Sequence, residues 1–281
     1  MKQSQKKQKL SGENGFEQYY SGLFGERWPA LKTALQAEPD HVSWNCGGEE
    51  TYFLDSASVR AAVTLPLEHA ESILDMCAAP GGKTLVIASG MGDEATLLSN
   101  ERSPERKNRL LRVCDCCLLP SVRERVRITC HDAAKMCLAK QECFDAILLD
   151  APCSSERHVL ADNSYLSEWS PSRIKTLAMA QWALLSSAWR MLRPDGFLLY
   201  ATCALSPEEN DGVISRLVKK FDDAKICKPL IHSDCYKRCM IEQKELPGYE
   251  RTDFGAHILP DKAGGAGPLY FSLLKKVRKI V

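Results

Sequence analysis

The stretch DMCAAPGGKT, residues 75–84, overlaps the end of the apolar run SILDMC at 72–77 and leads into a helix-favouring segment at 82–90. A proline and two glycines between a strand and a helix let the backbone turn tightly and approach a ligand closely. The helix that begins there offers free N–H groups to an anionic group. The stretch is not a Walker A phosphate loop, because that motif requires a glycine where this chain has Cys77. It therefore predicts a strand–turn–helix unit with a ligand at its turn.

Short apolar segments alternate with helix-favouring ones along the rest of the chain. Further strands are predicted at 95–100, 126–130, 144–150 and 196–203, with two more around 225–230 and 269–274. Several are almost wholly apolar, as in a parallel sheet that helices cover on both faces. Helices are predicted at 104–118, 132–140, 171–192 and 206–221. Seven strands in this alternation indicate a doubly wound α/β sheet.

The first sixty residues do not follow this alternation. Residues 1–13 are polar and charged without periodicity, which predicts a disordered basic tail. Residues 16–35 predict helical segments interrupted at Gly25 and Pro29, and a loop-rich stretch follows to about Asp55. We therefore expect a disordered tail at 1–13, a small helical extension at 14–60 and the α/β domain at 61–281.

Composition places the protein among ordinary globular chains. Hydrophobic residues make up 44% of the sequence, which supports a sizeable core. No apolar run reaches the roughly 18 to 20 residues that cross a bilayer. The polar, basic start MKQSQKKQKLSGENG lacks the apolar segment of a secretory signal. We therefore expect no membrane partner and a cytoplasmic location.

The 13 cysteines are expected to be reduced in that compartment rather than paired in disulfides. The densest group, Cys114, Cys116 and Cys117, has no second Cys-x-x-Cys or His partner at the spacing of a zinc finger. Cys235 and Cys239 are similarly isolated. Most cysteines are therefore predicted to be small buried apolar residues, and no metal is expected.

Charge is balanced overall, with a formal net charge of +1, so it does not by itself indicate a polyanion partner. Basic residues nonetheless gather near both ends, as Lys2, Lys6, Lys7 and Lys9 and as Lys275, Lys276, Arg278 and Lys279. Such runs are usually solvated tails, but local positive charge also contributes non-specific phosphate contacts. Both interpretations stay open.

Acidic residues follow the second and third predicted strands. The strand at 95–100 runs into Glu101, roughly 20 residues past the glycine turn, where nucleoside-binding sheets hold ribose hydroxyls. The strand at 126–130 runs into His131-Asp132, a position suited to an adenine. Because the full Gly-x-Gly-x-x-Gly fingerprint is missing, the site favours S-adenosylmethionine over NAD.

Cysteines follow the next two strands. The strand at 144–150 runs into Asp150-Ala-Pro-Cys153, and the strand at 196–203 ends in Thr202-Cys203. Open α/β sheets place their chemistry at the carboxyl ends of strands. Either cysteine alone is more readily explained as a buried apolar residue. The two contexts together predict two thiols at one edge of the sheet, beside the cofactor.

Two thiols beside a methyl donor suit methylation at carbon 5 of cytosine. That carbon is a poor nucleophile until a thiolate adds to carbon 6, and the thiol must be expelled after the carbon-5 proton has left. An ordinary cysteine is only slightly ionised at neutral pH, so the nucleophile needs activation. Asp150 is placed to stabilise the adduct through the exocyclic amine or ring nitrogen 3. The base must also leave its stack to enter the pocket.

The motifs CAAPGGKT, LLDAPCS and YATCALSPEEN together resemble the Sun-domain (Nop/Sun) family of RNA cytosine-5 methyltransferases, from Phe16 to the C-terminus. The resemblance implies a Rossmann-like class I methyltransferase sheet of seven strands, mostly parallel, whose last strand is antiparallel. It implies that Cys203 is the nucleophile and that Cys153 releases the methylated RNA, with Asp150 as the third catalytic residue. DNA cytosine methyltransferases use the cysteine of the Pro-Cys motif instead, so Cys203 favours RNA.

The resemblance also implies the residues that bind S-adenosylmethionine. These are Cys77, Ala78, Ala79, Pro80, Gly81, Gly82, Lys83, Glu101, Arg106, Asp132 and Asp150. Residues 77–83 would wrap the methionine end and the ribose side of the cofactor. Glu101 would bind the ribose hydroxyls, and Asp132 would lie by the adenine.

One departure concerns the substrate. Many family members read PCSGTG after the fourth strand, whereas this chain reads PCSSERH at 152–158. This variant, with the segment FGERWPAL, resembles the organellar branch, which modifies ribosomal or transfer RNA; ribosomal RNA is the first expectation. Residues 156–175 are predicted to form part of the RNA surface, although an ordinary polar loop explains them equally well. The residues of this segment that are expected to contact RNA are Arg157, His158, Trp169, Arg173 and Lys175.

Other functions stay open at this point. A methyltransferase acting on DNA, a small molecule or a protein would leave Cys203 without a role. A catalytically silent RNA-binding assembly factor would not need the full set of reactive residues that this chain carries. We expect a monomer, and an accessory protein is compatible with the small size of the chain.

Overall fold

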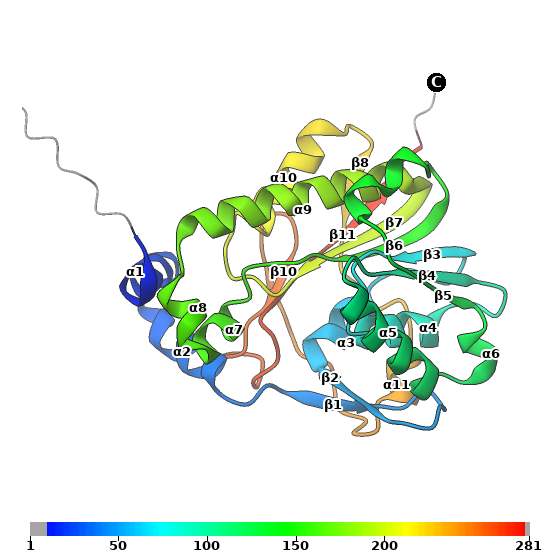
Figure 1. Cartoon of the computed structure of the whole chain (residues 1–281), viewed down its shortest axis with the longest axis horizontal. Helices are drawn as coiled ribbons and strands as arrows, with labels where there is room; N and C mark the ends of the chain where they lie inside the picture. The colour runs from blue at the N-terminus through cyan, green and yellow to red at the C-terminus, as the bar shows by residue number, and fades with distance from the viewer. Residues whose placement is uncertain (1–9, 279–281) are drawn as a thin grey trace, which may run out of the picture.

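The computed structural model describes residues 10–278. Nine strands form its main sheet (Figure 1). In spatial order they are β5 (Val126–Thr129), β4 (Thr96–Asn100), β3 (Ser72–Asp75), β6 (Phe144–Asp150), β7 (Leu192–Thr202), β11 (Leu269–Lys276), β10 (Ala256–Ile258) and β9 (Glu250–Arg251), with β8 (Ala224–Cys227) also paired to β11. All seven predicted strands are confirmed.

The strand directions also agree with the prediction. The strands from β5 to β7 pair in parallel. β11 runs antiparallel to β7 on one side, and on its other side it pairs with β8 and β10, one after the other. The last strand of a mostly parallel sheet is therefore antiparallel, and the expected Rossmann-like class I arrangement is confirmed. β9 and β10 are short additions that were not predicted.

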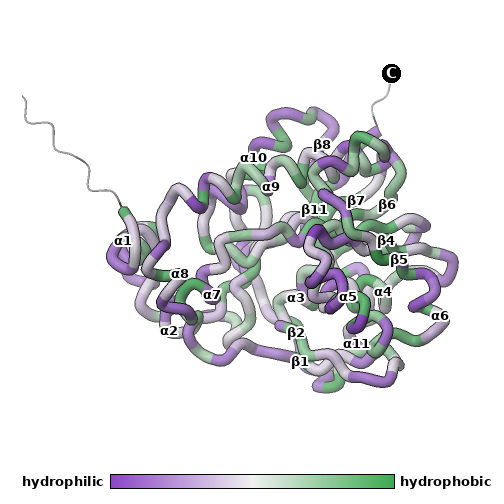
Figure 2. The backbone as a smooth tube through the Cα atoms, viewed as in Figure 1, coloured by the Kyte–Doolittle hydropathy of each residue, from purple (hydrophilic) through white to green (hydrophobic). Residues whose placement is uncertain are grey.

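Helices cover both faces of the sheet. One face carries α3 (Ser56–Ala62), α4 (Gly82–Gly90), α5 (Pro104–Cys117), α6 (Pro120–Arg123) and α11 (Cys235–Cys239). The other carries η2 (Ala133–Leu138), α9 (Pro171–Met191) and α10 (Asp211–Lys220). The predicted helix at 206–221 begins only at Asp211, and the residues before it form a turn. In Figure 2, hydrophobic residues lie mainly inside the molecule and hydrophilic residues mainly on the outer helices.

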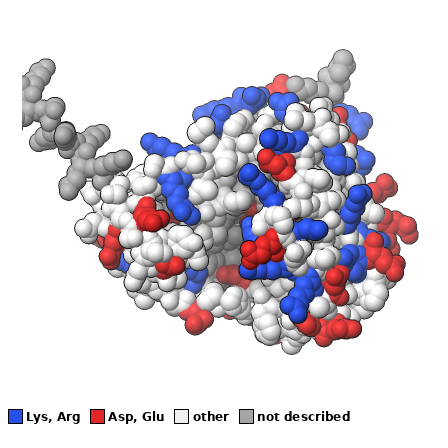
Figure 3. Space-filling view, in the orientation of Figure 1, with Lys and Arg blue, Asp and Glu red and all other residues white. Residues whose placement is uncertain are grey.

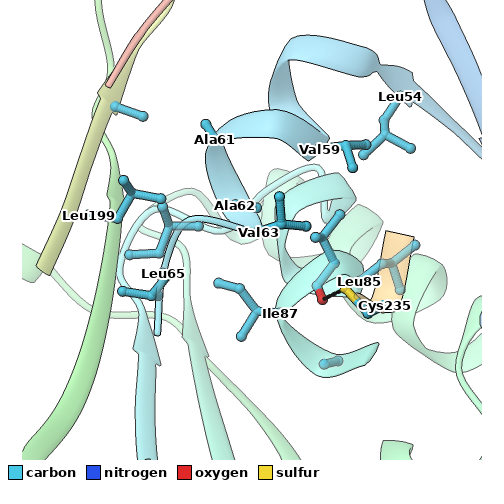
Figure 4. Packing of buried hydrophobic residues seen from close by; sticks show 14 of the residues in the cluster. Leu54, Val59, Ala61, Ala62, Val63, Leu65, Leu85, Ile87, Leu199 and Cys235 are labelled. Carbon is cyan, nitrogen blue, oxygen red and sulfur yellow. Dashed lines mark hydrogen bonds between the residues drawn. The ribbon is translucent and has the colours of Figure 1, made fainter. Parts of the chain in front are cut away.

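Alternate residues of the central strands supply two cores. Ile73, Ala146 and Leu199 pack on the α3–α4 side, whereas Leu74 and Ile147 pack on the α9–α10 side. Figure 4 shows part of the first core, where Leu65 lies near Leu199 of β7 and Leu85 lies near Cys235 of α11. Burial on both faces explains why these strands read as continuous apolar runs.

The N-terminal segment adds three helical pieces and a hairpin. α1 (Gly12–Phe24), η1 (Gly25–Arg27) and α2 (Trp28–Gln36) follow the predicted helical pattern, with the interruption at Gly25. β1 (His41–Trp44) and β2 (Tyr52–Asp55) pair in a hairpin within the stretch that was predicted to be loop-rich. Val42 and Trp44 are buried in the main core, so packing against the domain stabilises this hairpin.

The structure differs from the expectations for the chain ends at two places that it describes. A disordered tail was predicted at 1–13. Residues 1–9 lie outside the described part of the chain, but α1 begins at Gly12. Lys276 is only 7% exposed, and its Nζ donates to Leu192 O at 2.8 Å and to Glu142 Oε1 at 2.9 Å. This lysine belongs to the sheet rather than to a solvated tail. Lys2 to Lys9 and Lys279 lie outside the described residues.

A third core joins the N-terminal helices to two short ones, α7 (Glu156–Ala161) and α8 (Asn163–Ser167). This N-terminal cluster consists of Phe16, Tyr20, Trp28, Leu31, Leu35, Val159, Trp169, Ile174, Leu205 and Leu259. Leu205 comes two residues after Cys203, so the cluster reaches the loop that carries a predicted catalytic thiol. The boundary between extension and domain at residue 60 stays a prediction.

We expect Leu31→Ala to lower the free energy of unfolding by about 2–5 kcal/mol, because Leu31 is completely buried and its truncation leaves a cavity. Leu23→Ala on the preceding helix is the matched control, since Leu23 is 39% exposed and should cost under about 1 kcal/mol. Urea unfolding followed by circular dichroism measures both. Equal effects of the two substitutions would show that the cluster does not stabilise the domain.

Candidate active site

The turn after β3 is built around one glycine. Gly81 has φ of 124°, a region that side chains rarely adopt, and a Cβ there would lie 2.9 Å from Val113 Cγ1. The Ala78 amide donates to Asn100 O at 2.9 Å, which fastens the turn to the end of β4. The backbone of residues 77–83 is thereby held open toward the carboxyl edge of the sheet.

Asn100 connects the ends of three strands. Its Nδ2 donates to Met76 O at 3.2 Å and to His131 O at 3.1 Å, and its Oδ1 accepts from Thr129 Oγ1 at 3.0 Å. The side chain is completely buried. Because β3, β4 and β5 all end at this amide, it fixes the loops that the sequence predicted to bind the cofactor.

A cavity of about 190 Å³ lies above the glycine turn. It is lined by Tyr52, Phe53, Leu54, Asp55, Ser58, Asp75, Cys77, Ala78, Ala79, Pro80, Gly82, Lys83 and Asp150. Asp75 accepts from Thr84 Oγ1 at 2.6 Å through Oδ2, while its buried Oδ1 has no hydrogen-bond partner. Burial raises the pKa of Asp75 to about 7. This unpaired oxygen is available to a hydrogen-bond donor from a ligand.

Glu101 and Arg106 meet beside this turn. Glu101 is 4% exposed; Oε1 accepts from the Ser103 amide at 2.9 Å, whereas Oε2 accepts no hydrogen bond and lies 3.4 Å from Arg106 Nη1. Arg106 Nη2 donates to Ala79 O at 2.6 Å. Asp132 instead caps η2 and lines a separate cavity with His131 and neighbouring side chains.

A second cavity, of about 430 Å³, shares Asp55, Ser58, Lys83 and Asp150 with the first. Lys83 Nζ lies 2.7 Å from Asp150 Oδ2 at the junction. Burial alone would lower the pKa of Lys83, but the charge of Asp150 and the hydrogen bond to it raise that pKa above its usual value. Cys203 lines the second cavity, so the ion pair stands between the glycine turn and a thiol.

The two predicted catalytic cysteines lie in contact. The Sγ atoms of Cys153 and Cys203 are 2.8 Å apart. The hydrogen bond from Cys153 and one from the Ser155 side chain lower the pKa of Cys203. The contact with Cys203 and burial raise the pKa of Cys153 well above its ordinary value. Cys203 is therefore the better thiolate of the pair, and Cys153 the better thiol.

Neighbouring residues fix both cysteine-bearing loops. Asn210 Nδ2 donates to Ala204 O at 2.8 Å and its Oδ1 accepts from Thr202 Oγ1 at 2.6 Å. Gln181 of α9 donates to Pro152 O at 2.9 Å. The backbone at Ser155 is left-handed, with φ of 54°, which costs energy for a residue with a side chain. The PCSGTG pattern has a glycine at this position.

Comparisons with known proteins agree with this geometry. The family model for the 16S rRNA methyltransferase RsmB/F matches residues 62–273. The chain belongs to this family. NSUN4 of Bos taurus, a 5-cytosine rRNA methyltransferase, is 30% identical over 274 residues, which cover 87% of this chain and 71% of that protein. The resemblance to Sun-domain enzymes is thereby confirmed.

Two bacterial relatives are longer than this chain. Ribosomal RNA small subunit methyltransferase F of Salmonella paratyphi C is 40% identical over 214 residues, which cover 75% of this chain but 43% of that protein. For the same enzyme of Erwinia tasmaniensis the covered share is 33%. This chain thus spans a third to somewhat under half of these relatives.

Solved structures share this fold. The crystal structure of PH0851 superposes with a TM-score of 0.77 at 20% identity, covering 94% of this chain and 66% of that one. NSun6 from Pyrococcus horikoshii, crystallised with SFG, has a TM-score of 0.62 at 25% identity. The latter match covers 83% of this chain and 54% of the other.

The residues predicted for this RsmB/F-family site fall into two groups. Cys77 to Lys83, Asp150, Cys153 and Cys203 lie around the joined cavities or in direct contact with their lining. Glu101 and Arg106 lie beside the turn, while the structure does not bring Asp132 into the same cavity. Several lining residues were missed, among them Asp55, Ser58 and Asp75. Asp75 could have been noticed as the acidic last residue of the first strand.

The predicted RNA surface at 156–175 is wrong in part. Trp169 is 1% exposed because it packs in the N-terminal cluster. Arg157 donates to backbone carbonyls of Ala37 and Gly267 at 2.8 and 2.7 Å, so it fastens loops. His158 and residues 173 and 175 are exposed. Figure 3 shows a hollow beside α7 with Lys and Arg side chains on both rims.

Within residues 10–278, no group of three or more His, Cys, Asp or Glu side chains is arranged to hold a metal ion. All 13 cysteines are free thiols. In the same part of the chain, no helix is long and apolar enough to cross a membrane.

We expect Asp75→Asn to remove a pH-dependent loss of stability. The pKa of Asp75 is about 7 in the folded protein and roughly 3.9 when unfolded, so folding binds a proton between these values. The free energy of unfolding therefore falls as the pH rises through this window. From pH 4 to pH 8 the variant should gain roughly 2–4 kcal/mol relative to wild type in urea unfolding. If the free energies of unfolding of the variant and of wild type changed with pH in parallel, that result would contradict the raised pKa of Asp75.

Proposed function

We propose that this protein transfers a methyl group from S-adenosylmethionine to carbon 5 of a cytosine in RNA, through a covalent adduct with Cys203. The observation that carries the proposal is the contact between the Cys153 and Cys203 thiols, 2.8 Å apart, beside the Lys83–Asp150 ion pair. This ion pair lines both the cavity above the glycine turn and the cavity of Cys203. A methyl donor and a base could therefore meet at one point.

The residues at the first cavity fit S-adenosylmethionine. The unpaired buried Oδ1 of Asp75 suits a cationic amine, and Oε2 of Glu101 suits a ribose hydroxyl. The small residues Ala78, Ala79 and Gly82 leave the backbone accessible. When bound, the cofactor supplies a methyl group activated by its sulfonium. The relative crystallised with SFG belongs to the same family of folds.

Cys203 would act first. As the thiolate favoured by the hydrogen bond from Cys153, its Sγ bonds to carbon 6 of the cytosine and makes carbon 5 nucleophilic. Asp150 lines the same cavity, where it can contact the exocyclic amine or ring nitrogen 3. Lys83 holds the Asp150 carboxylate in place through their ion pair. Both interactions are aimed at the adduct rather than at the free base.

Cys153 would act in the release. Its raised pKa keeps it a thiol at neutral pH, beside the sulfur atom that must be expelled from carbon 6. After carbon 5 has taken the methyl group, it loses its proton to water, and the freed electron pair re-forms the carbon 5–carbon 6 double bond as the carbon 6–sulfur bond breaks. A thiol in that position can donate a hydrogen bond or a proton to the departing Cys203 sulfur. This division of roles matches the two pKa directions, which differ although the side chains are identical.

Ribosomal RNA is the proposed substrate, with transfer RNA as the alternative. The Salmonella and Bos taurus relatives are ribosomal RNA methyltransferases. A mitochondrial tRNA (cytosine(34)-C(5))-methyltransferase of Danio rerio is 29% identical over 248 residues, 86% of this chain and 64% of that protein. A monomer in the cytoplasm remains our proposal, and free thiols are compatible with such a reducing compartment.

Cys153→Ala is expected to accumulate a covalent protein–RNA adduct, because methylation can proceed while release is impaired. Cys203→Ala should form none, since it lacks the bonding sulfur. The variants would be expressed in cells, purified under denaturing conditions and examined for slow-migrating species that nuclease removes. Sequencing the attached RNA would identify the substrate and its cytosine.

Wild-type protein is the control for this experiment. If it methylates RNA while Cys153→Ala forms no adduct, the two cysteines do not divide the reaction in this way. If no variant forms an adduct and wild type methylates no RNA, a silent RNA-binding factor becomes the better explanation.

Glu101→Gln is expected to weaken S-adenosylmethionine binding about 10- to 100-fold, because a hydrogen bond to a charged group contributes roughly 1.5–3 kcal/mol. Isothermal titration calorimetry would measure the dissociation constant. Glu105→Gln is the matched control, since the Glu105 side chain lies nearby on α5 but is 78% exposed. Equal affinities for the two variants would remove Glu101 from the cofactor site.

A further inference from the structure

A buried pair of acids lies beneath the two thiols. Glu156 and Glu209 are both completely buried, and the Ser154 hydroxyl stands between them. Ser154 Oγ lies 2.5 Å from Glu209 Oε2 and is also hydrogen-bonded to Glu156 Oε1. Glu209 further accepts from Gln181 Nε2 and Ser206 Oγ, at 2.9 and 2.8 Å.

If both acids were ionised, these hydrogen bonds would lack one proton. A serine hydroxyl has a single hydrogen, yet its oxygen is within hydrogen-bond distance of both carboxyl groups. Ser154 can donate to one of them, so the other must donate to Ser154. Burial, followed by the charge of Glu209, raises the pKa of Glu156. One of the two acids is therefore protonated, as when two close carboxyls share one proton.

This pair joins the loops that carry Cys153 and Cys203. From the first loop, the Ser154 amide donates to Glu209 Oε1 at 2.9 Å. From the second, the Leu205 amide donates to Glu156 Oε2 at 2.8 Å. Glu209 thus accepts a backbone hydrogen bond from the residue after Cys153. Glu156 accepts one from the residue two positions after Cys203. Movement of either acid would change the distance between the sulfur atoms.

The N-terminal helix supplies the remaining partner. Tyr20 of α1 is completely buried, and its hydroxyl donates to Glu156 Oε1 at 2.5 Å. Its ring stacks on Trp28, with centroids 5.3 Å apart, so the hydroxyl has little freedom to turn away. Tyr20 lies outside residues 62–273, which match the family model. Glu156 itself belongs to the segment PCSSERH, which departs from the PCSGTG pattern.

We propose that Tyr20 and Glu156 are positioning residues, which hold Cys153 against Cys203 through the Ser154–Glu209 network and so tie the reaction to the N-terminal helix. This inference rests on the proposed function for its catalytic consequence, but its effect on the thiols does not require RNA. Loosening the network would separate the sulfurs, and Cys203 would lose the hydrogen bond that favours its thiolate. The proton shared by the two acids also spares the thiols a second buried negative charge.

The test compares Tyr20→Phe with Tyr19→Phe. The second variant is a matched control, because Tyr19 is the next residue on α1 and its hydroxyl donates to Glu208, outside the network. Intact protein would be alkylated with iodoacetamide between pH 5 and pH 10, and modification of Cys203 followed by peptide mass spectrometry. We expect the midpoint for Cys203 to rise by about one pH unit in Tyr20→Phe, the loss of one hydrogen bond.

Steady-state methylation gives the second readout. Tyr20→Phe should lower kcat about tenfold with KM nearly unchanged, because the RNA contacts are intact and only the thiol geometry is disturbed. A wild-type protein that methylates no RNA would refute the proposed function, and the alkylation profile would still decide the positioning role. If Tyr20→Phe and Tyr19→Phe have the same alkylation profile, the proposal is wrong.

A double-mutant cycle with Glu156→Gln tests the link directly. Glutamine has nearly the shape of glutamic acid, so it can keep the Ser154 and Leu205 hydrogen bonds, whereas its amide nitrogen cannot accept the one from Tyr20. We expect Tyr20→Phe/Glu156→Gln to shift the Cys203 midpoint no further than either single variant. Additive shifts would overturn the pairing. Should Tyr20→Phe fail to fold, a Glu156→Gln profile equal to wild type would overturn it as well.

Discussion

The parallel register of β6 and β7 is the constraint on which the site depends. Asp150 pairs with Ala201 across these strands, so the next residues of each strand leave the sheet side by side. Cys153 and Cys203 reach a separation of 2.8 Å only because both loops begin from that register. A slip of one residue would turn every side chain of a strand to the opposite face and separate the thiols. The apolar faces of both strands, buried in two different cores, make such a slip costly.

Buried ionisable groups are concentrated at the same edge of the sheet. Asp75, Glu156 and Glu209 are almost or completely enclosed, and Lys83 pairs with Asp150 beside them. Each of these groups costs free energy to bury, and an apolar residue would stabilise the fold better. This free-energy cost is explained if the site needs two different thiols, Cys203 with a lowered pKa and Cys153 with a raised pKa. Local hydrogen bonds create that difference between chemically identical side chains.

The sequence was sufficient to predict the seven strands, because burial on both faces of the sheet leaves an apolar run. It was also sufficient to predict Cys153 and Cys203, because sequence motifs mark the ends of their strands. It was insufficient where tertiary contacts decide. The β1–β2 hairpin has only four residues a strand, and it is stabilised by Val42 and Trp44 entering the core. Trp169 lies in a polar stretch of the sequence, but α1 covers it. The unpaired oxygen of Asp75 depends on neighbours from other segments, which no local pattern records.

The N-terminal helices lie outside the part of the chain that matches the family model, yet they contact the reactive loops by two routes. Leu205 packs in the N-terminal cluster, and Tyr20 donates to Glu156. The left-handed Ser155 lies between these contacts and the thiols, at a position where glycine would be unstrained. A strained loop keeps its conformation only if its surroundings hold it, and here α1, α2 and α7 provide those surroundings. A chain beginning at residue 62 would keep every motif residue and lose this support, so the motifs alone do not define the site.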